Sequence, residues 1–306
     1  MILPYIRRVR NVILAALLSF VLCVSMGACG TSDGLDDAQA HVDLSDVTVD
    51  KTLAAQVSKQ VSSDGVLTVG SNAVWAPAEF TGEDNQTVIG YEVDLIKAVA
   101  KVLGLKVKIQ EASFSSIIPA VGSKFDVGVS GFTITAEREK TVTFVQFYSA
   151  GMSYVVAKGN PKHIEADNLC GHKVSVQVGT SEETALEDTS ASCVKSGKPA
   201  LDLQVYEQQT QATQAVLAGR SDVMYSDTPV SGYAVSQTGG KLQLLGDAVD
   251  VAPQGIVLAK NDKKTAQAVR GAVQKLIDSG VYMRILKAWG VQDGAISTAE
   301  INPKVK

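Results

Sequence analysis

Two charged residues stand at matching points of a repeated sequence pattern. The stretches IIPAVGSKFDVGVSG (117–131) and QAVLAGRSDVMYSD (214–227) both read as a helix, a glycine, a basic residue, Asp-Val and a strand. The first continues to Arg138, and the second ends at Asp227. The planar guanidinium of arginine binds a carboxylate through two parallel hydrogen bonds, and an aspartate accepts hydrogen bonds from an ammonium group. The pair therefore predicts a site for a small zwitterion such as an α-amino acid.

The alternative for Arg138 is a solvated helix start, where it would form weak surface pairs with Glu137 and Glu139. The spacing of the two repeats favours the binding role. They lie about 95 residues apart, close to the length of one small α/β domain. Open parallel sheets bind ligands at the carboxyl ends of their strands. Two similar lobes would therefore present Arg138 and Asp227 to the same cleft.

Strand and helix patterns alternate through most of the chain, which predicts an α/β fold of parallel sheets covered on both faces. The period-3.6 pattern of VDLIKAVAKVLG, which ends at a glycine, is typical of a helix. Expected strands cover 66–70, 105–110, 125–131, 172–178, 203–207, 221–226 and 242–245, with helices at 50–60, 93–103, after 181, at 208–218, after 228 and at 263–289.

The first 28 residues are predicted to be an export signal. Arg7, Arg8 and Arg10 precede an apolar run over 12–24, and small residues follow. No other apolar run approaches the ~20 residues that a membrane-spanning helix requires. Residues 29–60 then read as an acidic, flexible tether that leads into a short helix.

Cys29 is the predicted attachment point of a lipid. The stretch SMGACG resembles the lipobox of bacterial lipoproteins, in which small residues precede a cysteine that becomes acylated. The alternative is ordinary cleavage after Ala28, which would leave a free cysteine. We expect an exported protein that lipidated Cys29 anchors to the outer face of the cell membrane.

The charge of the chain argues against nucleic-acid binding, and its cysteines favour a disulfide over a metal site. Of 28 basic residues the signal holds three, so 25 remain against 32 acidic ones, a formal charge of −7 that disfavours nucleic-acid binding. In an oxidising compartment, Cys170 and Cys193 are expected to form a disulfide. A metal pair is the alternative, but His163 and His172 lack the spacing that such sites use. We expect no metal and no cofactor.

From Gly65 to about Ile296 the chain resembles the bacterial solute-binding proteins of polar amino-acid ABC transporters, family 3. The order, spacing and number of the matching stretches carry the resemblance, more than any one of them. These stretches are GVLTVGSNAVWAPAEF, IGYEVDLIKAVAKVLG, SFSSIIPAVGSKFDVGVSGFTITAEREKTVTF, VSVQVGTSEE, SDVMYSDTP and YMRILKAWG.

The resemblance implies a two-lobed periplasmic-binding-protein fold of type II, with the ligand cleft between the lobes. The chain would cross between lobes near 148–154 and 250–256, where Gly151, Pro253 and Gly255 interrupt the strand patterns. Lobe 1 is then discontinuous, over 61–152 and 254–300, and lobe 2 covers 153–253.

The resemblance also assigns roles to single residues. The arginine that holds the ligand carboxylate falls on Arg138, and the ammonium-binding aspartate falls on Asp227. The Gly131 carbonyl and the Thr133 hydroxyl would also bind the ammonium. Thr180 opens a helix whose free N–H groups would meet the carboxylate, as the helix dipole favours.

Further positions would surround the ligand. Trp75 and Phe114 fall where the family has aromatic walls, with core packing as the alternative. Asn72, Gln177 and Ser226 fall on positions that meet the ligand side chain. Binders of basic amino acids usually carry an aspartate at the position of Asn72, so the pocket as mapped predicts a neutral polar ligand such as glutamine.

Ala78 is a second position, after Asn72, at which the chain departs from the family pattern, because the family commonly has an aromatic residue there.

The expected function is to bind an amino acid outside the cell, as a monomer, and to deliver it to an ABC permease and its ATPase. The alternative is an enzyme on the same scaffold, dehydratase-like, that acts on a small carboxylic acid. No G-x-S-x-G, H-E-x-x-H or phosphate-loop motif supports it. Glu79 is the one further acid that maps near the pocket, and a solvated position is expected for it.

Overall fold

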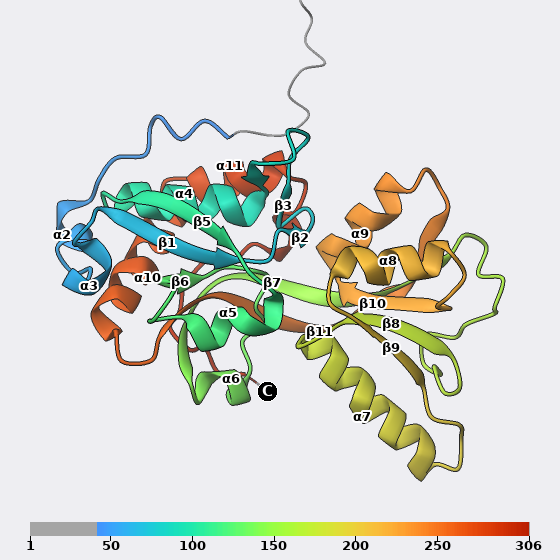
Figure 1. Cartoon of the computed structure of the whole chain (residues 1–306). Helices are drawn as coiled ribbons and strands as arrows, with labels where there is room; N and C mark the ends of the chain where they lie inside the picture. Colours follow the sequence, from blue (N-terminus) through green and yellow to red (C-terminus); the bar gives the residue numbers. More distant parts are fainter. Residues whose placement is uncertain (1–41, 306) are drawn as a thin grey trace, which may run out of the picture. The chain divides into compact units, whose positions relative to one another are not determined.

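The computed structural model describes residues 42–305, so the predicted signal peptide and Cys29 lie outside the described residues. Within them, eight strands form one sheet in the order β5-β1-β6-β11-β7-β10-β8-β9, and three short strands form a second sheet in the order β2-β3-β4 (Figure 1). The strands of the large sheet are β1 (Val66–Ser71), β5 (Lys106–Glu111), β6 (Val127–Gly128), β7 (Val142–Ala157), β8 (Lys173–Gln177), β9 (Asp202–Tyr206), β10 (Val223–Asp227) and β11 (Leu242–Ala259). Those of the small sheet are β2 (Val74–Trp75), β3 (Glu79–Thr81) and β4 (Val88–Ile89).

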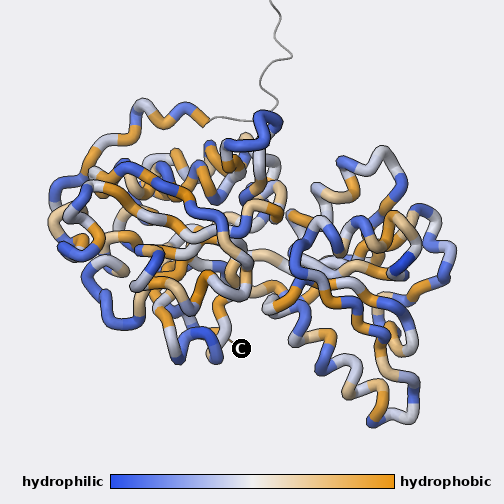
Figure 2. The backbone as a smooth tube through the Cα atoms, viewed as in Figure 1, coloured by the Kyte–Doolittle hydropathy of each residue, from blue (hydrophilic) through white to orange (hydrophobic). Residues whose placement is uncertain are grey.

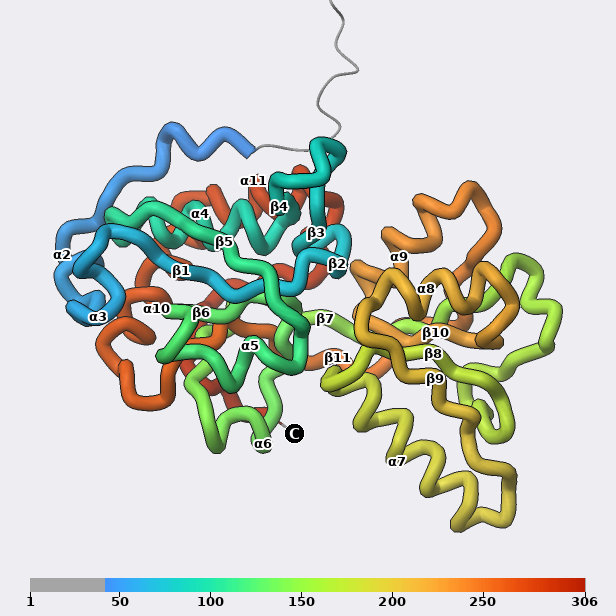
Figure 3. The backbone as a smooth tube through the Cα atoms, in the orientation of Figure 1, coloured from blue at the N-terminus to red at the C-terminus, as the bar shows by residue number. Residues whose placement is uncertain are grey.

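Each half of the large sheet is parallel, as the alternating pattern predicts. Strand β1 pairs with β5 and β6, and β8 pairs with β9 and β10, all in parallel. The prediction omitted the long antiparallel pair β7 and β11, which lies between the halves and joins them into one sheet (Figure 3). Only 242–245 of β11 was expected as strand. The rest contains exposed residues, a proline and two glycines, so it lacks the apolar alternation on which the prediction depended.

The helices flank the two halves of the sheet. In the first half they are α2 (Lys51–Ala54), α3 (Lys59–Ser62), α4 (Tyr91–Val102), α5 (Phe114–Ala120), α6 (Ala136–Glu139), α10 (Lys263–Asp278), α11 (Val281–Ala288) and the 3-10 turn η1 (Gln292–Gly294). In the second half they are α7 (Ser181–Lys195), α8 (Gln209–Leu217) and α9 (Thr228–Gln237). Hydrophobic and hydrophilic residues are interspersed along these helices (Figure 2).

Four clusters of buried apolar residues, two in each half, form the core of the described residues. The largest cluster joins β1 to the buried faces of α4, α10 and α11, so the C-terminal helices pack on the first half. A smaller cluster joins β8 and β10 to α7 and contains Cys193. The chain is thus a two-lobed α/β protein. We use lobe 1 for 61–152 with 254–300 and lobe 2 for 153–253; these boundaries remain a prediction.

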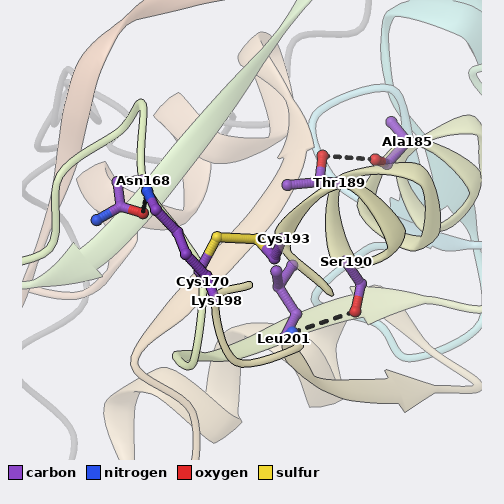
Figure 4. Close-up of a disulfide and its surroundings, with 8 residues drawn as sticks. All are labelled: Asn168, Cys170, Ala185, Thr189, Ser190, Cys193, Lys198 and Leu201. Atoms are coloured by element: carbon purple, nitrogen blue, oxygen red, sulfur yellow. Dashed lines mark hydrogen bonds between the residues drawn. A yellow bond between two sulfur atoms is a disulfide. The ribbon is translucent and has the colours of Figure 1, made fainter. Parts of the chain in front are cut away.

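The predicted disulfide is confirmed. Cys170, just before β8, is bonded to Cys193 in the last turns of α7, with Cα atoms 5.7 Å apart (Figure 4). It fastens the C-terminal end of α7 to the segment that leads into β8. Among residues 42–305, no group of three or more His, Cys, Asp or Glu side chains is arranged to hold a metal ion. In the same range no helix is long and apolar enough to cross a membrane.

Candidate functional site

Arg138 turns inward from helix α6. Thr135 caps this helix and accepts a hydrogen bond from the Arg138 backbone N–H at 3.2 Å. The guanidinium donates from Nη1 to the Thr133 carbonyl at 2.7 Å and from Nη2 to the Gly179 carbonyl at 3.0 Å. Its Cζ also lies 5.7 Å from the ring centre of Phe114. These contacts fix the plane of the guanidinium and link lobe 1 to lobe 2, so the surface pairs of the solvated alternative do not form.

Asp227 ends strand β10 in lobe 2 and is only 4% exposed. Its Oδ2 accepts a hydrogen bond from Gln254 Nε2 at 2.8 Å. Burial raises the pKa of Asp227 well above its ordinary value, and the neighbouring Glu182 carboxyl raises it further, while the Gln254 amide and the Trp75 indole oppose the shift. Asp227 is therefore a buried acid that a cationic group would stabilise in its charged form.

Gly131 lies where the two lobes meet, and only glycine fits there. Its φ is +57°, and a Cβ would stand 2.9 Å from Nε1 of Trp75 and 3.6 Å from Oδ2 of Asp227. Its carbonyl accepts from Gln254 Nε2 at 3.2 Å. The same amide therefore bridges the Gly131 carbonyl and the Asp227 carboxylate, two of the three acceptors predicted for a ligand ammonium. Sequence reasoning missed Gln254, which lies on β11.

The N-terminus of α7 lies beside Arg138. Thr180 caps this helix, since its Oγ1 accepts from the Glu183 N–H at 3.2 Å and donates to the Gln177 carbonyl at 2.8 Å. The next residue, Ser181, shares a hydrogen bond between its Oγ and Thr133 Oγ1 at 2.9 Å, across the two lobes. The Arg138 guanidinium and the N-terminal end of the 15-residue helix α7, which carries partial positive charge, thus lie side by side. Both groups favour the binding of an anion.

Aromatic rings line the lobe 1 side. Trp75 and Phe114 stack with ring centres 6.3 Å apart, and Phe114 stacks on Phe132 at 4.8 Å. All three are buried, and the Arg138 guanidinium lies near the two phenylalanine rings. Phe132 was not predicted, because it reads as an ordinary core residue between Gly131 and Thr133.

The structure brings Asn72 and Gln177 together from opposite lobes. Gln177 Nε2 donates to Asn72 Oδ1 at 2.8 Å and to the Glu207 carbonyl at 3.1 Å. Ser226 is different, because its Oγ bonds Ser231 of α9 at 2.8 Å. Consecutive strand residues point to opposite faces, so Ser226 cannot share the direction of the next residue along the strand. The Ser226 hydroxyl is thus engaged within lobe 2, and a contact of Ser226 with the ligand side chain stays a prediction.

Two buried acids lie behind the Gly131 turn. Glu79 is 0% exposed, which corrects the solvated position expected for it. Its Oε1 accepts from Ser130 Oγ at 2.7 Å, and both oxygens of Glu92 accept from the Gly131 N–H, at 3.2 and 3.0 Å. Burial raises the pKa of both carboxyls, that of Glu92 to about 7, and the neighbouring Glu92 carboxyl raises that of Glu79 further. The two acids hold the Ser130–Gly131 turn in place.

Glu182 is a third acid that sequence reasoning missed. It lies in the first turn of α7, where acids are usually solvated, yet it is 2% exposed. Its Oε2 accepts from Ser181 Oγ at 3.1 Å, and its Oε1 has no hydrogen-bond partner in the described part of the chain. Burial raises the pKa of Glu182, against the opposing effect of the Arg138 charge.

The chain matches the family model described as bacterial extracellular solute-binding proteins, family 3, over residues 67–292. It is 37% identical over 252 residues to the arginine-binding protein ArgT of Corynebacterium glutamicum, with 82% of each chain covered. It is 27% identical to the ABC transporter glutamine-binding protein GlnH of Bacillus subtilis, with 92% of this chain and 97% of that protein covered.

Solved structures show the same fold. An ancestral arginine-binding protein bound to arginine matches with a TM-score of 0.68 and 32% identity, covering 74% of this chain and 98% of that one. The ancestral amino acid-binding protein AncCDT-1, a precursor of cyclohexadienyl dehydratase, matches with a TM-score of 0.68 and 30% identity, covering 78% and 99%. The fold, the site and these matches together show that the chain belongs to the family 3 bacterial extracellular solute-binding proteins, the amino-acid-binding components of ABC transporters.

Proposed function

We propose that this protein binds a free α-amino acid between Arg138 and Asp227 and delivers it to an ABC permease. The observation that carries the proposal is the pair of opposite charges that the two lobes present. Asp227 is buried, Arg138 is half-buried and held by two backbone carbonyls, and the two form no direct ion pair with each other. The ligand carboxylate would bind Arg138 and the N-terminus of α7. The ligand ammonium would bind Asp227 and the Gly131 carbonyl.

Binding would stabilise the closed arrangement of the lobes, because the ligand adds bonds to both of them. Several contacts already join the lobes, among them Arg138 to Gly179, Ser181 to Thr133, Gln177 to Asn72 and Gln254 to Asp227. A closed, loaded protein offers the permease a surface that the open form lacks. Lipidated Cys29 would hold the protein at the outer face of the membrane, close to that permease.

The ligand side chain decides which amino acid is bound. The sequence predicts a neutral, glutamine-like ligand because the mapped pocket holds no added acid. Glu182 is a buried acid near the site that the sequence did not predict. Relatives are named for arginine as well as for glutamine. We therefore propose a polar amino acid with hydrogen-bond donors at the end of its side chain.

A thermal-shift screen over the twenty amino acids tests the proposal, followed by calorimetry on those that shift. A ligand at 100 times its dissociation constant stabilises the fold by ~2.7 kcal/mol, which gives a clear rise in melting temperature. A screen in which no amino acid raises the melting temperature, and calorimetry detects no binding, would refute the proposed function. Turnover of a prephenate-like acid by the purified protein would instead favour the enzyme alternative.

A further inference from the structure

The helix that follows Asp227 packs against the other lobe. Strand β10 ends at Asp227, which is also the N-cap of α9. Val230, in the first turn of this helix, is 4% exposed and belongs to the largest apolar cluster of lobe 1, although α9 is part of lobe 2. Tyr233 lies three residues further along, and residues with this spacing share one face of a helix. One face of α9 is therefore directed at lobe 1.

On lobe 1, Tyr233 meets an aromatic ring whose position is fixed. Its ring centre lies 5.7 Å from that of Phe80 on β3, the strand opposite α9 (Figure 1). Phe80 also meets Trp289 edge to face at 6.0 Å, and the Trp289 indole N–H donates to Asp94 Oδ2 of α4 at 2.9 Å. Aromatic pairs at such separations attract each other beyond the effect of area burial. The contact thus adds an attraction between the lobes at a place outside the predicted ligand contacts.

The first turn of α9 is fastened to the strands of lobe 2. Ser231 Oγ bonds Ser226 Oγ of β10 at 2.8 Å, one residue before Asp227. Thr228 Oγ1 bonds Ser153 Oγ of β7 at 2.9 Å. The helix and the carboxyl end of β10 therefore move as one body. Whatever fixes α9 against lobe 1 also fixes the Asp227 carboxylate relative to that lobe.

We propose that Val230 and Tyr233 are positioning residues, which dock α9 on lobe 1 when the lobes close and so hold Asp227 against the Gly131 turn. The inference rests on the proposed function and extends it to residues that act through Asp227. Lobes that separate lose the contact of Tyr233 with Phe80, so this contact favours the closed arrangement. Because the ligand takes no part in it, the contact should strengthen the binding of every accepted amino acid by the same factor.

Removing either ring tests the proposal. Tyr233→Leu and Phe80→Leu each abolish the aromatic contact and keep an apolar side chain. Calorimetry with L-arginine and L-glutamine should show both amino acids weakened by one common factor, about two- to tenfold, as expected for one aromatic pair. The double variant should lose less affinity than the product of the two single losses, because both changes remove the same contact. Tyr233→Phe keeps the ring and should bind like the wild-type protein.

Stopped-flow kinetics separate this role from a general loss of structure. A contact that forms only as the lobes close slows the release of the ligand, so Tyr233→Leu should raise the dissociation rate constant and leave the association rate constant nearly unchanged. Tyr206→Leu is the matched control, because Tyr206 is also half-buried but packs on an apolar cluster within lobe 2. It should retain both rate constants, and circular dichroism should show a native spectrum for each variant.

Several results would overturn the positioning role. These are unchanged or tighter binding by the folded Tyr233→Leu and Phe80→Leu variants, a loss that differs between the two amino acids, and losses that multiply fully in the double variant. A wild-type protein that binds none of the twenty amino acids would overturn the proposed function itself, which is a different result.

Discussion

Replacing Arg138 with alanine should weaken amino-acid binding by roughly 100- to 5,000-fold. A guanidinium has five N–H donors. In this structure two of its bonds go to the Thr133 and Gly179 carbonyls, which leaves donors for the ligand carboxylate. Without Arg138 that carboxylate is desolvated with no cation beside it, at a cost of about 3–5 kcal/mol. Each 1.4 kcal/mol is a factor of ten in the dissociation constant.

Arg138→Lys separates charge from geometry. A lysine ammonium keeps the positive charge, but a point charge cannot bond two carbonyls and also bind a carboxylate through a planar fork. We therefore expect Arg138→Lys to lose most of the affinity as well. Asp227→Ala should weaken binding by a similar factor, because it leaves the ligand ammonium unpaired.

Calorimetry with the best ligand of the amino-acid screen measures these effects. Circular dichroism should show a native spectrum for each variant. Arg270→Ala is the matched control, since Arg270 is an exposed arginine on α10, outside the site. A solvated arginine would contribute at most ~1 kcal/mol. A dissociation constant for Arg138→Ala within a few-fold of the wild-type value would therefore refute the role assigned to this residue.

Three further outcomes are expected. The pKa of Glu92 is raised to about 7 in the folded protein, from 4.5 in the unfolded chain. Between these two pH values the folded protein keeps a proton on Glu92 that the unfolded chain has released. The free energy of unfolding should therefore fall between pH 4.5 and 7, and Glu92→Gln should flatten this slope in denaturant melts; an unchanged slope would contradict the assignment. Breaking the Cys170–Cys193 bond, which spans 23 residues, should cost ~3 kcal/mol in urea melts, whereas two free thiols in the unreduced protein would show that no bond exists. Cys29→Ser should release the protein from the membrane without a change in ligand affinity, and a variant still in the membrane fraction would place the anchor elsewhere.

The sequence predicted the features that depend on local pattern. Alternating strands and helices indicated an α/β fold, and the repeated units placed Arg138 and Asp227 at the ends of comparable strands. The disulfide followed from the export signal and the cysteine count. Strand β11 was mostly missed because its exposed middle section carries no apolar alternation. Its length depends on pairing with β7, a partner about a hundred residues away in the sequence.

The acids of the site show a different limit. Glu79 and Glu182 stand in polar sequence surroundings and were expected in solvent or overlooked. They are buried because distant segments cover them: Glu79 lies against Ser130, and Glu182 against the end of β10. No period in the local sequence reports such burial. The electrostatic character of the cleft could therefore not be predicted, although its two principal charges could.

The paired strands β7 and β11 make most of lobe 2 an insertion with adjacent ends. Ala157 pairs with Leu242, and the Lys158 N–H donates to the Lys241 carbonyl at 2.9 Å, so residues 158–241 leave and rejoin the ladder at a single rung. A segment with adjoining ends can be exchanged as a cassette without stretching the scaffold that receives it. Here the cassette carries Asp227 and Glu182, whereas the scaffold keeps Arg138. Recombination at this rung would therefore keep the Arg138 half of the site and exchange the half that contains Asp227 and the N-terminus of α7.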